Sequence, residues 1–333
     1  MESRLSINQI ADIAGFSVAT ISRVINNRGG YSKETEEKVH RIIEEYNYTP
    51  NANASGLRTN RSHSIGVMVP DIMNEFFAKI IRELDLYFLK HRYVVLICDS
   101  NEDSALENMH LRNLLTKNVD GIIYISGKNE VLKPEQIGVP VVYVDRSPKN
   151  AEVLVHSDNV TGGYLATKEL IDAGCKKIMF FGDERLRSPV RRRRDGCRKA
   201  LREAGFKNDK MFFVGSLPDY ESSRQRMREI LHDEGCYFDG VFTTNDMMAL
   251  GVIDALRESG YSVPGDVKVV GYDNIPTSEF CVPKITTVTQ DTKEIADRAA
   301  DALLKMIHGE SIEKKDIIIP VALTKRESTS LTK

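Results

Sequence analysis

The sequence lacks the features of metal-binding, secreted and membrane proteins. Its five cysteines form no CxxC pair and have no His-rich partner segment, so neither a zinc site nor a disulfide framework is supported. The N-terminus MESRLSINQI is polar where a secretory signal needs an apolar stretch, and no run approaches the roughly 20 apolar residues of a membrane span. We therefore expect an unprocessed protein of the reducing cytoplasm, without a metal ion or a membrane partner.

Enzyme motifs are also missing from the sequence. There is no GxGxxG, Walker A, GxSxG or HExxH motif, so neither a nucleotide cofactor nor a hydrolytic site has an anchor. The seven histidines form no ligand-spaced pair. We expect a protein that uses no cofactor and is not an enzyme.

Charge of one sign is not in excess. The 333 residues hold 46 Lys and Arg and 48 Asp and Glu, a formal net charge of −2, which argues against a uniformly basic nucleic-acid-binding protein. Locally the balance differs, because residues 17–33 carry three basic residues and residues 46–70 carry two, with no acid in either stretch. Contact with phosphates needs such basic stretches, so any DNA contact is confined to them.

The apolar pattern changes near residue 62. Before that point, apolar residues recur at helical spacing in three short segments, preceded by the plausible N-caps Ser6, Ser17 and Ser32. Gly15 lies between the first two segments, where a tight turn needs a residue that accepts positive φ. We predict a small all-α helix-turn-helix headpiece over residues 1–49.

After residue 62, short apolar runs alternate with amphipathic helical segments. Such runs are typical of strands buried on both faces of a parallel sheet. The pattern occurs twice, over about 64–156 and 177–285, and predicts an α/β core of two doubly wound parallel-sheet subdomains. A helix at 295–308 and an extended run at 316–324 could return the chain to both. The predicted runs are 65–69, 93–98, 121–125, 139–144, 177–181, 211–214, 240–242 and 267–271.

Several segments resemble one family along essentially the whole chain. Residues 6–26, SINQIADIAGFSVATISRVIN, and residues 48–62, YTPNANASGLRTNRS, resemble the headpiece of the LacI/GalR family of bacterial transcription regulators. IGVMVPDIMNEFFAKII, NVDGIIYIS, VPVVYVDR, RDGCRKALREAGF and PKITTVTQD resemble its ligand-binding domain in order and spacing.

The resemblance implies three parts of the chain. These are the headpiece 1–49, a hinge helix or linker 50–62, and a periplasmic-binding-protein-like core over 63–333. The N-subdomain is expected over about 63–158 and 290–318, and the C-subdomain over about 159–289 and 319–333.

The second predicted helix would enter the DNA major groove with its N-terminal residues. Val18 and Ala19 are suited to thymine methyl contact and by resemblance help to choose the operator, while Arg23 could read guanine. Leu57 matches the family's hinge-helix leucine, a wedge in the minor groove. For the hydroxyl side chains, helix capping and solvation remain the alternative. The predicted DNA-binding residues are Ser17, Val18, Ala19, Thr20, Ser22, Arg23, Asn26 and Leu57.

The hinge departs from the family at Ser55-Gly56, where an Arg-Ser or similar pair is common. A glycine inside a helix costs about 1 kcal/mol relative to alanine. Gly56→Ala is therefore expected to tighten operator binding.

Polar and aromatic residues cluster where strands are expected to end, which is where open α/β sheets bind ligands. Asp, Asn and Arg side chains bind vicinal hydroxyls, and aromatic faces cover a sugar ring. For the Phe pair a core role remains open, and Asp145 could simply cap a strand end. By resemblance, the effector-binding residues are Asn74, Phe76, Phe77, Asp145, Arg146, Arg193, Tyr220, Asn245 and Asp273.

Two features leave the class of ligand open. Glu75 stands where the family often has Pro, and residues 191–194 are four consecutive arginines. Only Arg193 is expected to face the ligand, and the other three are expected to form a solvated face. The effector is thus a sugar, an acid sugar or a sugar phosphate.

Together these expectations describe a homodimeric repressor that binds operator double-stranded DNA under control of a small-molecule effector. A free sugar-binding receptor and a sugar-processing enzyme are the alternatives. The attached helix-turn-helix speaks against the first, and the lack of a catalytic pair against the second.

Overall fold

The computed structural model describes residues 5–48, 61–125, 137–146, 148, 151–185, 187–206 and 211–330. The chain divides into two compact units, Met1–Ser62 and His63–Lys333. None of the described helices is long and apolar enough to cross a membrane.

The first unit holds a helix-turn-helix. Helices α1 (Ile7–Ala14), α2 (Val18–Ile25) and α3 (Lys33–Glu45) begin after the serines that the sequence marked as caps. Gly15 ends α1 with a φ of 70°, which relieves the strain that a side chain would meet there. The three helices bury one apolar cluster, which comprises Ile10, Ala11, Ala14, Ile21, Val24, Val39, Ile42 and Tyr48.

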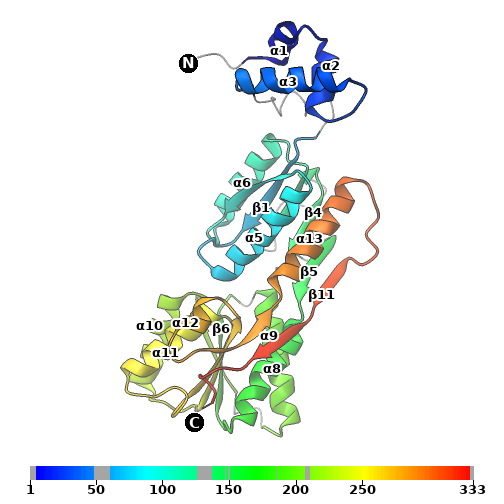
Figure 1. The fold of residues 1–333 in the computed structure, drawn as a ribbon. Helices are drawn as coiled ribbons and strands as arrows, with labels where there is room; N and C mark the ends of the chain where they lie inside the picture. Colours follow the sequence, from blue (N-terminus) through cyan, green and yellow to red (C-terminus); the bar gives the residue numbers. More distant parts are fainter. Residues whose placement is uncertain are drawn as a thin grey trace. The chain divides into compact units, whose positions relative to one another are not determined.

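The second unit contains a first lobe around the strand order β11-β5-β4-β3-β1-β2 (Figure 1). Helices α5 (Glu75–Lys90) and α13 (Thr292–Ile307) pack on one face of this sheet and α6 (Ser104–Thr116) on the other. The strands are β1 (Ser64–Val69), β2 (Val94–Asp99), β3 (Gly121–Tyr124), β4 (Val141–Val144), β5 (Val153–Ser157) and β11 (Asp316–Ile319).

A second lobe repeats the arrangement with the order β12-β10-β9-β8-β6-β7. Helices α10 (Tyr220–Asp233) and α11 (Asp246–Glu258) cover one face, and α8 (Asn159–Asp172) and α9 (Ser188–Glu203) the other; α12 (Thr277–Phe280) is a single turn. The strands are β6 (Ile178–Asp183), β7 (Met211–Ser216), β8 (Gly240–Thr243), β9 (Lys268–Asp273), β10 (Thr286–Gln290) and β12 (Val321–Thr324).

The extended run at 316–324 does return the chain to both lobes. Pro320 separates β11, which runs parallel to β5, from β12, which runs antiparallel to β10. One continuous segment therefore links the edges of both sheets (Figure 1).

Strands β5 and β10 were absent from the predicted runs. β10 reads TTVTQ, too polar to resemble a buried run, yet Thr286 and Thr287 are fully buried and their hydroxyls are hydrogen-bonded. β-branched threonine suits a strand once its hydroxyl has a partner. β5 reads VLVHS, so the buried polar residues His156 and Ser157 shorten its apolar run to three residues.

Candidate functional site

Helix α2 presents its first turn to solvent. Val18, Ala19 and Arg23 are exposed, with Val18 at 39% exposure despite its apolar side chain. The buried side of the helix is Ile21 and Val24, which fixes the opposite face outward. An exposed apolar residue at a helix start is available for contact with a base edge, and the same helix carries an exposed arginine.

The polar residues of α2 already serve the helix itself. Ser17 Oγ accepts a hydrogen bond from the Thr20 amide at 3.2 Å, and Asn26 Nδ2 donates to the Ser22 carbonyl at 2.7 Å. The capping alternative therefore holds in the free chain for Ser17. The predicted wedge Leu57 lies outside the described residues.

A cavity of about 380 Å³ lies between the lobes of the second unit, within the size range of small-molecule sites. Residues that follow strands of both sheets form its walls. Eight of the predicted effector residues line it: Asn74, Phe76, Phe77, Asp145, Arg146, Arg193, Asn245 and Asp273.

Tyr220 is not among the residues that line the cavity. Its hydroxyl instead donates to Asp254 Oδ2 on α11 at 2.5 Å. Tyr220 is the first residue of α10, and this bond joins α10 to its neighbour within the second lobe. Asp219, the residue before it, caps α10 and lines the cavity in its place.

In the first lobe, α5 brings three predicted residues to the cavity. Asn74 Oδ1 accepts from the Phe76 amide at 3.0 Å and so caps the helix. Phe76 and Phe77 are 3% and 6% exposed and belong to the core of the first lobe while also lining the cavity. The same two phenylalanine side chains therefore belong to the hydrophobic core and to the wall of the cavity.

Arg193 is held in the second lobe by a close approach of two helices. A methyl group at Gly163 on α8 would lie 1.9 Å from the Arg193 carbonyl oxygen, and one at Gly196 would lie 2.0 Å from the Val160 oxygen. Only glycine allows this contact. The guanidinium then donates to Asn159 Oδ1 at 2.7 Å and to the Thr244 carbonyl, and lies 3.6 Å from the centre of the Tyr272 ring.

Two buried carboxyl groups accompany Arg193. Burial raises the pKa of Asp273 well above its ordinary range, an effect that Arg193 opposes and that Asp246 and Asp145 reinforce. Burial likewise raises the pKa of Asp246 to about 7, against hydrogen bonds from Thr287 and Ile275. Asp273 also accepts from Gln290 Nε2 at 2.7 Å, so its position is fixed by the lobe itself.

A cluster of charges on the cavity wall was missed from the sequence. Glu102 follows β2, and Asp183, Arg185 and Arg187 lie at or just beyond the end of β6. The same strand-end rule that found Asn74 and Asp145 applies to them. The predicted run ends at residue 181, whereas β6 continues to Asp183, so Asp183 and the two arginines after it were not assigned to a strand end.

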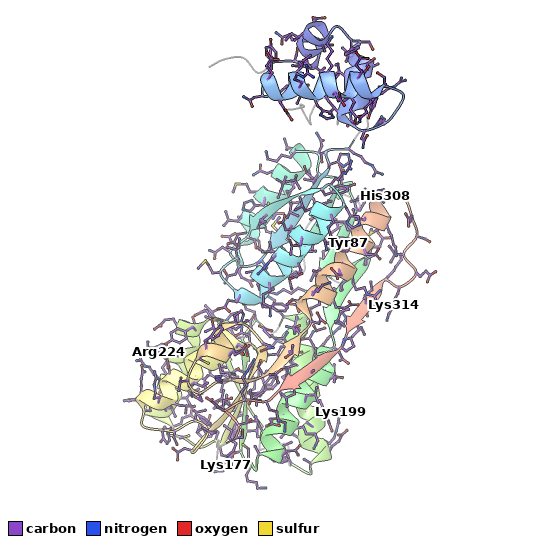
Figure 2. All side chains as sticks on the ribbon, viewed as in Figure 1. Tyr87, Lys177, Lys199, Arg224, His308 and Lys314 are labelled. Atoms are coloured by element: carbon purple, nitrogen blue, oxygen red, sulfur yellow. The ribbon has the colours of Figure 1, made fainter. Side chains whose placement is uncertain are left out.

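The tetra-arginine segment does not form the solvated face that was predicted. Arg191 is exposed, but Arg192 and Arg194 are half-buried. Arg192 Nη1 lies 2.8 Å from His156 Nε2 across the lobes, and Arg194 lies 5.6 Å from the centre of the Phe213 ring. Arg224, toward the outer side of the second lobe (Figure 2), is also half-buried and pairs with Glu258.

Further bonds join the lobes at α5. The Glu75 carboxylate accepts from the backbone amide of Thr277 at 3.1 Å and from its hydroxyl. Lys79 Nζ donates to the Asn274 carbonyl at 3.3 Å. Glu75, the residue that departs from the family pattern, thus links the first lobe to α12 of the second.

Comparison with known proteins identifies the family. The model of "Bacterial regulatory proteins, lacI family" matches residues 6–51, and that of "Periplasmic binding protein-like domain" matches residues 167–329. A ribose operon repressor of Halalkalibacterium halodurans is 32% identical over 324 residues, which cover 97% of each chain. The chain belongs to the lacI family. It is a DNA-binding transcription regulator and not an enzyme.

Solved structures agree with this membership. The lac repressor dimer bound to operator and the anti-inducer ONPF has a TM-score of 0.86 at 26% identity, over 98% of this chain and 99% of that one. A lacI-family regulator of Enterococcus faecium with bound ribose has a TM-score of 0.73 at 29% identity, over 81% of this chain and 100% of that one. The predicted fold class is confirmed.

Proposed function

We propose that this lacI-family regulator is a cytoplasmic homodimeric repressor whose operator affinity is set by a sugar-derived effector bound in the cavity between the lobes. The names of its relatives support the class of ligand, since one represses a ribose operon and another binds ribose. A relative's dimeric complex with operator supports the assembly. Two copies would contact a near-palindromic operator, because the symmetry of a dimer matches that of paired half-sites.

One observation carries the proposal: a single cavity has walls from both lobes. A ligand there would bridge the lobes and favour one degree of closure over another. Closure would bear on the bonds that already cross between the lobes, those of Glu75 with Thr277 and of Lys79 with Asn274. The effector can therefore shift the population that binds DNA.

Reading of the operator is assigned to the exposed start of α2. Val18 and Ala19 would contact thymine methyl groups, and Ser17, Thr20, Ser22 and Asn26 would contact phosphates or base edges. Arg23 would pair with guanine or a phosphate. Leu57 would enter the minor groove at the operator centre.

The DNA half of the proposal is tested by selecting operators from random duplex DNA with the full chain and measuring affinity by fluorescence anisotropy. Arg23→Ala should weaken binding to the selected operator by about 1–3 kcal/mol. Arg41→Ala, on the exposed side of α3, is the matched control and should leave affinity nearly unchanged.

Failure to select any sequence, or equal losses in the Arg23 and Arg41 variants, would refute the assignment of α2. Sugar binding without sequence-specific DNA binding would instead favour the free receptor.

A further inference from the structure

Three arginines from both lobes meet at one carboxylate on the cavity wall. Arg146 Nη1 lies 2.6 Å from Glu102 Oε1, in the first lobe. Arg185 Nη1 and Arg187 Nη2, from the second lobe, each lie 3.2 Å from Glu102 Oε2. We call Arg146, Arg185 and Arg187 the arginine cluster.

The three arginines of this cluster pair directly with two carboxylates, those of Asp183 and Glu102. Asp183 is taken up by Arg185, with Nε to Oδ1 at 2.8 Å and Nη2 to Oδ2 at 2.9 Å. Glu102 alone is then left to face Arg146 and Arg187. Three guanidinium groups thus share two carboxylates at a partly desolvated wall of the cavity, which leaves donors free for an anion. The other carboxylates of the cavity lining make no ion pair with the cluster among the described residues: Asp71, Asp145, Asp219 and Asp273.

Arg187 has hydrogen-bonding capacity to spare. Its side chain is only 15% exposed, and its buried Nε has no hydrogen-bond partner among the described residues. A buried donor without a partner costs free energy that a ligand oxygen can recover. Burial lowers the pKa of Arg187, Glu102 opposes this shift, and Arg146 and Arg185 add to it, as expected where like charges are crowded.

The same cavity also offers groups suited to hydroxyls. Asp145 Oδ1 is buried and accepts no hydrogen bond from the described residues. Asn74 and the nearby side chains of Phe76 and Phe77 also line the cavity. The cavity thus combines an anion-binding cluster with an acceptor and apolar faces for a polyhydroxyl ring.

We propose that the arginine cluster is an anion subsite and that the effector is an anionic sugar, one that carries a carboxylate or phosphate group. This inference rests on the proposed function, since it specifies the ligand of the same cavity. The anionic group accepts a hydrogen bond from the unpartnered Nε of Arg187 and binds the cluster together with Glu102. The cluster contains arginines from both lobes. A bound anion therefore connects the two lobes, as the Glu102 carboxylate does in this structure.

The test compares neutral sugars with their anionic derivatives on the full chain, by thermal shift and calorimetry. The probes are ribose with ribose 5-phosphate, and glucose with glucose 6-phosphate, gluconate and glucuronate. At least one anionic member should raise the melting temperature more than its neutral parent and bind at least tenfold more tightly. The carboxylate and phosphate arms separate the two sources of charge.

Variants distinguish an anion subsite from a purely structural ion-pair cluster. Arg187→Gln should remove the preference for the anionic member, whereas Arg191→Gln, an exposed arginine outside the cavity lining, should keep it. Glu102→Gln should strengthen the preference for the anionic member over its neutral parent, because it removes the competing charge. Loss of folding would move both cavity variants in the same direction.

The inference is overturned if neutral and anionic members bind equally, if no acid or phosphate of the panel binds, or if the Arg187 and Arg191 variants behave alike. Operator affinity is measured separately in the same preparations. Intact operator binding that responds to a neutral sugar would leave the proposed function standing while rejecting the anion subsite.

Discussion

The two lobes place an aspartate at the same point of the fold and surround it differently. Asp145 follows β4 and Asp273 ends β9, strands that occupy matching positions in the two sheet orders. Both have positive φ, 62° and 108°. Asp273 is buried against Gln290 and Arg193, whereas Asp145 is half-buried and its Oδ1 has no partner among the described residues.

The difference indicates that the two lobes prepare their matching aspartates for a ligand in different ways. Around Asp273, the second lobe fixes polar side chains on one another, so this carboxyl group is already oriented before any ligand arrives. The first lobe leaves an acceptor to be satisfied by a ligand.

Arg193→Ala should lower the free energy of unfolding of the second unit by about 3–5 kcal/mol, because it strands the buried Asp273 and the acceptors Asn159 and Thr244. Arg146→Ala in the first lobe should cost about 1–2 kcal/mol, since Glu102 keeps two other arginine partners. Urea unfolding of both variants measures the contrast. Equal losses would contradict the idea that the second lobe is the preorganised one.

The buried carboxyl pair predicts a pH dependence for the second lobe. The folded chain holds the proton of Asp246 more tightly than the unfolded chain, with a pKa of about 7 against 3.8. Its contribution to stability is therefore complete below the ordinary pKa and is lost as pH rises through about 7. Asp273 acts in the same direction, while Arg326 and Arg193 oppose the shifts.

Asp246→Asn should reduce the difference in unfolding free energy between pH 5 and pH 8 by about 2–3 kcal/mol relative to the wild type. Urea titrations at the two pH values measure it. Asp85→Asn, at an exposed position of α5 in the first lobe, is the control and should leave the wild-type profile in place. A profile that Asp246→Asn does not alter would show that this carboxyl is already ionised at pH 5.

Asp145→Asn should leave the free energy of unfolding within about 0.5 kcal/mol of the wild type. It should nevertheless weaken effector binding at least tenfold, because a neutral amide with one acceptor oxygen replaces the carboxylate that awaits the ligand. Calorimetry with the tightest sugar of the panel above measures the loss. Retained affinity would mean that Asp145 only ends its strand, the alternative raised from the sequence.

The smallest expected effect concerns the hinge, which lies outside the described residues. Gly56→Ala should tighten operator binding by up to about 1 kcal/mol, since alanine favours the helix that the family resemblance implies. Anisotropy at fixed salt measures it. Unchanged or weaker binding would contradict a hinge helix at this position.

Much of the fold followed from simple patterns. Buried parallel strands such as β1 and β8 are almost wholly apolar, so they stand out against amphipathic helices. β10 did not, because its threonines are buried only by virtue of hydrogen bonds that the tertiary structure supplies. Spacing along the chain cannot reveal such partners.

The candidate cavity was predictable to the extent that strand ends mark it. Asp145 and Asp273 lie directly after or at the end of strands, and Asn74 lies in the connection from β1 to α5. The family resemblance pointed to the same positions. Tyr220 does not line the cavity of this structure, because a first helical residue can face either the cavity or the neighbouring helix and its hydroxyl bonds to Asp254. Its role in effector binding stays a prediction. Arg187 could not be predicted as a cavity residue, because its position depends on the bond to Glu102, which is 85 positions away in the chain.

The most direct test of the account is the operator affinity of the full chain with and without the sugar that binds the cavity most tightly. The account predicts that the sugar changes the operator dissociation constant at least tenfold in the wild type and that Asp145→Asn abolishes the response while keeping operator affinity in its absence. An operator affinity that the bound sugar leaves unchanged would contradict it.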